Sequence, residues 1–167
     1  DGSHIDVDRH LPVPCALINT SKVMLQYGDT SEARLESQPK LYATTEELSV
    51  GSKEDRDPRP PNGALIGLKR TIGEVTALAE LAEEHADGLL TLGLIDGSLI
   101  LWSPEFQSFP EQVRQSLLGG AFLPALDRLK VVATRNPLAV AAYISLPRST
   151  TLVNTLPLQE HTQADYR

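Results

Sequence analysis

The chain has 167 residues, 22% of them charged and 41% hydrophobic, which is the length and balance of one soluble globular domain. Its net charge of −7 argues against a protein that binds nucleic acid through a uniformly basic surface. A single cysteine, Cys15, excludes a disulfide framework and a zinc site built from cysteines. No apolar run is long enough to span a membrane and no signal peptide is present, so the sequence predicts a cytoplasmic protein.

Charge is distributed unevenly along the chain. Residues 1–105 carry 9 basic and 18 acidic side chains, whereas residues 106–157 carry 5 basic and 2 acidic ones. An acidic half beside a basic half would suit a metal site next to a phosphate-binding surface, although ordinary solvated surface explains the same distribution. The chain begins without Met inside a strand-like segment, so we expect a domain at 1–157 that is incomplete at both ends, followed by a polar tail at 158–167.

The first elements predicted in the chain are two short strands. Residues 13–18 and 22–27 are strand-like, and the turn-forming residues 19–21 between them predict a β-hairpin. Residues 28–63 are polar, with prolines and alternating charges concentrated at 51–63, which predicts a mobile loop there.

A long helix is predicted from Ala64 to His85, since apolar residues recur there at intervals of three and four. Glu74 lies at the edge of this apolar stripe, one turn after Arg70, whereas Glu80 has polar and acidic neighbours typical of a solvated face. Residues 89–95 form a nearly continuous apolar run, which predicts a strand covered on both faces. The segment 98–102 is a candidate to pair beside it.

The remaining elements alternate between helix and strand. Ser108 and Glu111 have capping-box spacing and predict a helix that ends at Gly119-Gly120. A buried strand is predicted at 138–145, and a short helix capped by Ser149 at 149–156. This order predicts an α/β fold with a mixed β-sheet flanked by helices.

Three carboxylates are candidates for a metal site. The tripeptide Asp-Gly-Ser occurs twice, at Asp1 and at Asp96, each time where a strand ends or bends. Asp-Gly is also a common turn pair, so the repeat alone favours an ordinary turn. Together with Glu74 on the helix, however, the two aspartates supply the hard oxygen ligands that Mg²⁺ and Mn²⁺ prefer.

These residues carry a resemblance to a known family. The sequence resembles the NurA-type nuclease domain, with a fold similar to RNase H, and is closest to cyanobacterial-type members. The matching segments are Asp1 to Ile5 with Asp8 to His10, Ala16 to Asn19, Lys40 to Ala43, Lys69-Arg70 with Glu74, Leu94 to Trp102, and Ala142 to Ser149. The second Asp-Gly-Ser with its apolar flanks and the run from Tyr143 to Ser149 are the most specific of them.

The resemblance implies a Mn²⁺-dependent (or Mg²⁺-dependent) deoxyribonuclease that processes DNA ends from the 5′ side in double-strand break repair. It also implies a HerA-type hexameric translocase as partner and allows a homodimer. Asp1, Glu74 and Asp96 would then be catalytic metal ligands. Family members have a further active-site residue near the C-terminus, often a histidine, for which His161 is the candidate here. Arg148 could hold a DNA phosphate.

Other interpretations remain open. A non-catalytic RNase H-like binding module would keep the fold and use the carboxylates structurally. Another RNase H-like phosphoryl-transfer enzyme would share the same aspartates. Arg148 is equally compatible with a surface charge near a helix cap, and His161 with an exposed tail.

Overall fold

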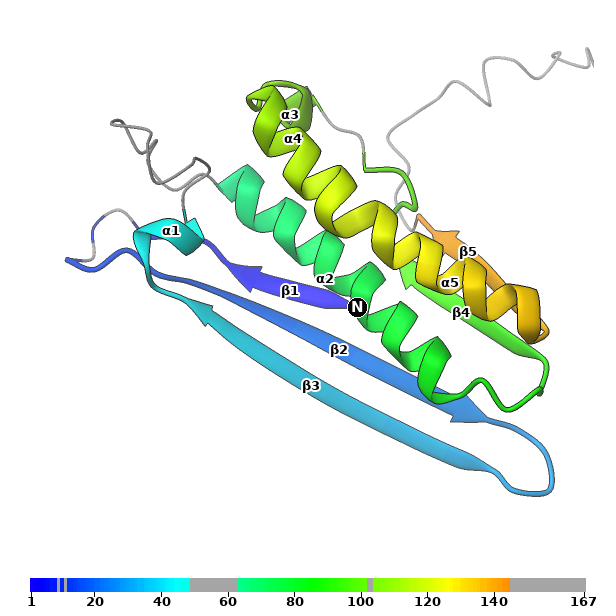
Figure 1. The fold of residues 1–167 in the computed structure, drawn as a ribbon. Helices are drawn as coiled ribbons and strands as arrows, with labels where there is room; N and C mark the ends of the chain where they lie inside the picture. Colours follow the sequence, from blue (N-terminus) through cyan, green and yellow to red (C-terminus); the bar gives the residue numbers. More distant parts are fainter. Residues whose placement is uncertain (9, 11, 49–62, 102–103, 145–167) are drawn as a thin grey trace, which may run out of the picture.

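The computed structural model describes residues 1–8, 10, 12–48, 63–101 and 104–144, and it confirms the predicted α/β class (Figure 1). An antiparallel sheet and a parallel sheet both pack against one long helix, an arrangement compatible with an RNase H-like fold. None of the helices in these residues is long and apolar enough to cross a membrane.

The first sheet is an antiparallel meander of β1 (Gly2–Ile5), β2 (Ala16–Gln26) and β3 (Glu32–Tyr42). The predicted turn at residues 19–21 is wrong, because these residues lie inside β2. There Asn19 pairs with Ser3 on one side and Pro39 on the other. Turn-forming residues are held in a strand here because strands on both sides satisfy the backbone. The actual turn lies at Gly28, whose φ of 124° suits glycine.

Strand β3 was not predicted, since its segment was interpreted as polar loop. The strand alternates charged residues on one face, such as Glu32, Arg34 and Glu36, with Ala33 and Leu35 on the other. Both faces are almost fully exposed, so the apolar positions are few and the period of two is weak. Pairing along all eleven residues of β2 is what fixes this segment as a strand.

A short helix, α1 (Thr45–Leu48), leads towards the long helix α2 (Gly63–Glu84), which confirms the prediction of a helix at 64–85. Gly63, the last residue of the predicted loop at 51–63, lies in this helix, and residues 51–62 lie outside the described part of the chain. The predicted stripe of α2 is buried or packed against the core at Leu65, Leu68, Ile72, Val75, Leu78 and Ala82.

The second half of the chain adds β4 (Thr91–Asp96), α3 (Pro104–Gln107), α4 (Glu111–Leu117), a π-helical turn η1 (Leu118–Phe122), α5 (Leu123–Arg135) and β5 (Leu138–Tyr143). Strands β4 and β5 pair in parallel, which confirms both as strands. The prediction that the last strand is buried is wrong, because none of the residues of β5 is fully buried. The predicted helix end at Gly119-Gly120 is wrong. Both glycines are absorbed into the π-helical turn, so that α4, η1 and α5 form one continuous helical run.

Two further expectations about this half are corrected. The helix α4 begins at Glu111 with Pro110 as its N-cap, and no side chain caps it, so the capping box at Ser108 does not form. Residues 98–101 are not in a strand, and Trp102 lies outside the described residues.

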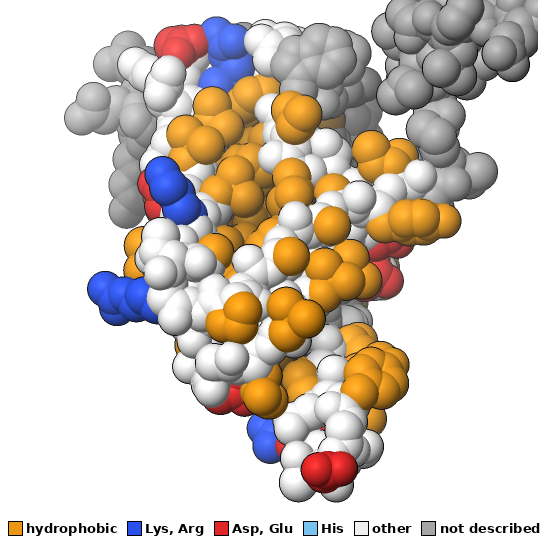
Figure 2. All heavy atoms as spheres, turned by 90° about the vertical axis from the view of Figure 1, so that its right-hand side faces the viewer, with side chains coloured by type: hydrophobic (Ala, Val, Ile, Leu, Met, Phe, Trp, Pro, Cys, Tyr) orange, Lys and Arg blue, Asp and Glu red, His pale blue; other side chains and the backbone are white. Residues whose placement is uncertain are grey.

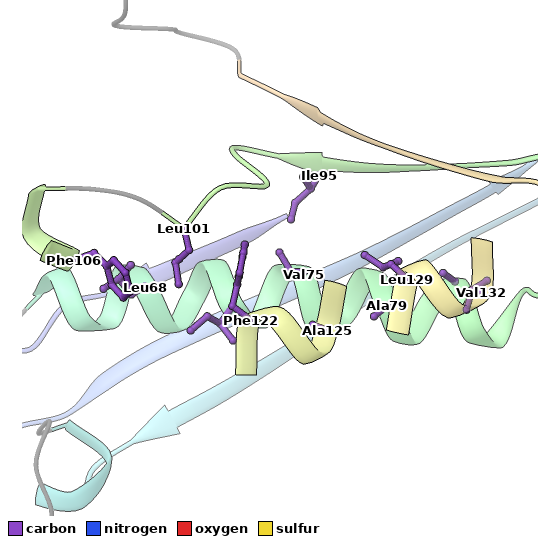
Figure 3. Close-up of a cluster of buried hydrophobic side chains, with 12 residues drawn as sticks. Leu68, Val75, Ala79, Ile95, Leu101, Phe106, Phe122, Ala125, Leu129 and Val132 are labelled. Atoms are coloured by element: carbon purple, nitrogen blue, oxygen red, sulfur yellow. The ribbon is translucent and has the colours of Figure 1, made fainter. Parts of the chain in front are cut away.

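The main hydrophobic core lies between α2, α5 and β4 (Figure 3). Phe122 from η1 and Leu129 from α5 belong to this cluster together with Val75 and Ala79 of α2, and Ile95 extends from β4 towards it. A second, smaller cluster joins Ala16 and Ile18 of β2 to Leu48 and Ile66. Helix α2 therefore contributes to both clusters and holds the two sheets together.

Among the described residues, helices cover only one face of each sheet. Gly93 and Ile95 of β4 face α2 and the core, whereas Leu92 and Leu94 are each 61% exposed. The prediction that this strand is covered on both faces is therefore wrong. Figure 2 shows that hydrophobic side chains also form much of the surface on one side of the molecule.

The two sheets are separate, and both pack against α2. Strand pairing joins β1 to β2 and β4 to β5, and within the described residues no pairing joins β1 to β4. The first residue of the chain, marked N in Figure 1, lies near the tip of β4. This brings the end of β4 towards the start of β1, beside the middle of α2.

Candidate functional site

Glu74 is the centre of the candidate site. It lies in the middle of α2, and its side chain is only 4% exposed. A glutamate this buried is uncommon unless it is paired or binds a cation. Its position at the edge of the apolar stripe, predicted from the sequence, is confirmed and brings the carboxylate against the first strand.

Gly2 provides the space for the Glu74 carboxylate. A Cβ atom built on Gly2 would lie 2.6 Å from Oε1 of Glu74 and 3.0 Å from Cγ of Arg70. Both contacts are closer than ordinary van der Waals separation. The first Asp-Gly-Ser therefore has a glycine because α2 approaches β1 closely at this point, which allows a helix carboxylate to lie beside the strand.

The electrostatic surroundings of Glu74 are mixed. Burial raises the pKa of its carboxyl group above the usual value. Arg70 and a hydrogen bond with the backbone of Gly2 act in the opposite direction, and the charge of Asp96 raises this pKa further. Glu74 therefore interacts with the start of β1, through Gly2, and with the end of β4, through Asp96.

Arg70 is the basic residue nearest to this carboxylate in the described chain. Its Nε lies 3.5 Å from Oε1 of Glu74, and its Nη1 donates a hydrogen bond to the carbonyl oxygen of Gly2 at 3.4 Å. Arg70 and Glu74, one helical turn apart, thus form an ion pair with a long contact. It partly neutralises the buried carboxylate without a short hydrogen bond.

Asp1 and Asp96 lie at the ends of the two strands that approach Glu74. The carboxylate Oδ1 of Asp1 accepts a hydrogen bond from the backbone N–H of Gly2 at 2.7 Å. Asp96 is the last residue of β4, and the next residue, Gly97, has a φ of 126° that ends the strand in a bend. Both aspartates are exposed, in contrast to the buried Glu74.

The three predicted ligands are thus brought to one region but are not drawn together around one point. Within the described residues, no three His, Cys, Asp or Glu side chains are arranged closely enough to hold a metal ion. The donor set itself is suitable for Mg²⁺ or Mn²⁺, because it consists of carboxylates alone. The buried charge of Glu74 experiences that of Asp96 and is paired with Arg70 through a long contact of 3.5 Å, which fits a site that would gain from a cation.

Glu80 belongs to a different part of α2. It forms an ion pair with Lys22 of β2, with 2.7 Å between Oε2 of Glu80 and Nζ of Lys22. Oε1 of Glu84 lies 3.7 Å from the same Nζ. The expectation of a plain solvated face is therefore wrong, since Glu80 is half-exposed and paired. The side chain of Lys22 is 6% exposed, so it is buried between β2 and α2, and its ion pair with Glu80 links these two elements.

The other two predicted site residues, His161 and Arg148, lie outside the described residues. Arg70 and Gly2 also belong to the site, and neither was predicted from the sequence as a site residue. Both have a sequence signal: Arg70 is one helical turn from Glu74, and Gly2 follows the aspartate of a repeated motif.

Comparison with known proteins identifies the family. Neither the curated proteins nor the solved structures include a significant match to this chain. A family model does match, and it spans residues 1–165, almost the whole chain. The chain therefore belongs to the NurA domain family, a family of nucleases that work with DNA.

Proposed function

We propose that this protein is a Mn²⁺-dependent deoxyribonuclease, with Mg²⁺ as the alternative cation, and that Asp1, Glu74 and Asp96 hold the metal. The observation that carries the proposal is the buried Glu74 carboxylate, which lies against Gly2 and interacts with Asp96. A structural glutamate at this position would cost stability, because burial disfavours its charge. A cation bound by Glu74 would offset this cost of burying the charge.

The chemistry assigned to these residues is phosphodiester hydrolysis. A bound divalent cation would activate a water molecule and stabilise charge on the leaving oxygen. Glu74 is fixed by its burial and by Gly2, so it would be the rigid ligand. Asp1 and Asp96 are exposed at strand ends, so their side chains can adjust towards a cation and towards DNA. Such adjustment is needed because the three carboxylates do not converge on one point in the structure.

Family membership supports a finer proposal about the biological role. We propose that the protein trims DNA ends from the 5′ side during double-strand break repair, together with a HerA-type hexameric translocase. A homodimer is compatible with the exposed apolar side chains on β3 and β4. His161 would complete the active site, and Arg148 would bind phosphate.

The proposal is tested with DNA labelled at the 5′ end, incubated with the protein in Mn²⁺, in Mg²⁺ or in chelator. We expect loss of the label only with a divalent cation. Asp96→Asn keeps the size of the side chain and removes its charge, so cleavage should fall at least about a hundredfold. Asp87→Asn is the matched control, because Asp87 also precedes a glycine of positive φ next to β4.

The same experiment separates the alternatives. DNA binding without cleavage in any cation would favour the non-catalytic binding module, which the lack of a converged ligand group in the described residues would suit. Turnover of ATP without DNA cleavage would favour a phosphoryl-transfer enzyme. Equal cleavage by wild type and Asp96→Asn would contradict the metal site.

A further inference from the structure

The guanidinium group of Arg70 has more hydrogen-bonding capacity than its contacts use. An arginine has five N–H donors in a planar fork. In the described residues, Nη1 donates to the carbonyl of Gly2 at 3.4 Å, and the buried Nε has no hydrogen-bond partner, lying 3.5 Å from Oε1 of Glu74. The side chain is 36% exposed, so part of the fork faces solvent beside the carboxylates.

The neighbouring lysines are engaged in other contacts. Nζ of Lys69 donates to the backbone carbonyl of Glu47 and lies 5.1 Å from the centre of the Tyr42 ring. Nζ of Lys22 is paired with Glu80. Arg70 is therefore the basic side chain that the described structure offers to a ligand at the Glu74 site.

An acidic site that acts on DNA needs a cationic group for the phosphates. The chain carries a net charge of −7, and the candidate site itself consists of carboxylates, so the DNA backbone is repelled there unless positive charge is present. A bound cation supplies part of that charge. An arginine adjacent to it can supply a directed contact, because its fork matches the oxygens of a phosphate.

We infer that Arg70 binds a backbone phosphate of the DNA strand that lies at Glu74, and that its contacts with Gly2 and Glu74 hold the guanidinium ready for it. This inference rests on the proposed function. It assigns a phosphate contact within the described residues, independently of Arg148. Arg70 is held on a helix and against a strand, so little side-chain freedom is lost when the phosphate binds.

The test measures DNA binding in chelator, so that no cleavage occurs, by fluorescence anisotropy of a labelled oligonucleotide at several salt concentrations. A phosphate contact releases counterions, and each one contributes about 0.7 (single strand) to 0.9 (duplex) to the slope of log affinity against log salt. Arg70→Gln should weaken DNA binding at low salt by about tenfold. It should also reduce the magnitude of the slope by about 0.7 to 0.9, the contribution of one phosphate contact. Arg70→Lys keeps the charge, so it should retain the slope and lose affinity only a few-fold.

The matched control is Arg114→Gln. Arg114 also lies on a helix, pairs with a nearby glutamate and has a buried Nε without a hydrogen-bond partner in the described residues, but it lies on α4 and pairs with Glu111. Its removal should leave the salt slope unchanged. A role confined to stabilising Glu74 would lower the melting temperature of both Arg70 variants and leave the slope of each at the wild-type value.

The outcomes distinguish this inference from the proposed function. If the wild type binds DNA and Arg70→Gln lowers the slope, the phosphate contact is supported even if no cation produces cleavage. If cleavage occurs and the slope is unchanged in Arg70→Gln, the inference is overturned while the nuclease remains. Should Arg70→Gln fail to fold, a wild-type slope together with reduced affinity in Arg70→Lys supports the inference, and unchanged affinity overturns it.

Discussion

The carboxylate of Glu74 occupies the space that a side chain at position 2 would need, since a Cβ atom on Gly2 would lie 2.6 Å from Oε1. This relationship joins the first strand to the long helix across 72 positions of the sequence. It also places the buried charge next to Asp1, so the local packing and the candidate chemistry depend on the same glycine.

Gly2→Ala should therefore displace Glu74 and impair catalysis. We expect cleavage to fall at least about tenfold, since small misplacements of catalytic groups are costly. The loss of stability should stay within about 1–3 kcal/mol, typical of overpacking. Gly67→Ala is the control, because nothing lies within 4 Å of a Cβ atom at that helical position, and it should be neutral or stabilising. Equal cleavage by Gly2→Ala and wild type would show that the exact position of Glu74 is unimportant.

The raised pKa of Glu74 should make the free energy of unfolding depend on pH when no metal is present. Burial raises this pKa in the folded protein, so the folded state binds more protons than the unfolded state just above the usual glutamate pKa of 4.5. Wild-type stability should then fall as pH rises through the folded-state pKa. Glu74→Gln lacks this group, so it should be more stable than wild type at pH 8, by a difference that narrows towards pH 4.5. Denaturant unfolding in chelator measures this difference, and a gap that widens on acidification would contradict the cause given for the shift.

The sequence predicted those parts of the fold that have a strong local pattern. The apolar stripe predicted α2, and the apolar runs predicted β4 and β5, because each pattern follows from burial against the core. In contrast, β3 has few apolar residues and is held mainly by pairing with β2, a non-local interaction that a local pattern does not contain. The glycines in η1 indicated a helix end, but packing of Phe122 in the core outweighs their low helix propensity.

The candidate site was predicted only in part, for a related reason. Glu74 could be placed from helical periodicity, and the two aspartates from their repeated tripeptide. The close approach of Gly2 to the helix depends on the distance between α2 and β1, which no local pattern encodes. The role of Lys22 was missed for the same reason, since its partner Glu80 is far along the chain.

The Lys22–Glu80 pair is expected to stabilise the contact between β2 and α2. Lys22→Met removes a buried charge whose partner remains half-exposed, so we expect a loss of about 0.5–2 kcal/mol in unfolding free energy. The hydrogen bond with Glu80 raises the pKa of Lys22, so its contribution is fully present below pH 10.5 and is lost as pH rises through the higher folded-state value. A double-mutant cycle with Glu80→Gln measures the coupling. Additive effects of the two substitutions would mean that the contact contributes nothing.

Because one face of β4 is exposed, substitutions at the adjacent residues Leu94 and Ile95 should have very different effects on stability. Ile95 is 3% exposed and packs in the main core, so Ile95→Ser should cost about 3–5 kcal/mol through cavity formation and a buried hydroxyl. Leu94 is 61% exposed, so Leu94→Ser should cost less than about 1 kcal/mol. Chemical unfolding of both variants measures the costs. Similar costs at the two positions would show that Leu94 is covered in solution.

The last prediction concerns the response of the fold to a cation, and it does not require activity. A cation bound only by the folded state adds about 2.7 kcal/mol at a hundred times its dissociation constant. For a domain of this size that corresponds to a rise of about 5–10 °C in melting temperature. Wild type should show this rise in excess Mn²⁺ relative to chelator. Glu74→Gln and Asp96→Asn should show a much smaller rise, because each removes a ligand, and Asp96→Asn should melt in chelator at or above the wild-type temperature, because repulsion with Glu74 is relieved.

Glu80→Gln provides the control for that experiment, because Glu80 lies on the same helix but is paired with Lys22. It should melt somewhat lower than wild type in chelator and respond to Mn²⁺ as the wild type does. This combination separates a loss of stability from a loss of cation binding, which a single variant cannot do. Identical wild-type melting curves in chelator and in excess Mn²⁺ would contradict the metal site. A weaker Mn²⁺ response in Glu80→Gln than in Glu74→Gln would show that the other face of α2 carries it.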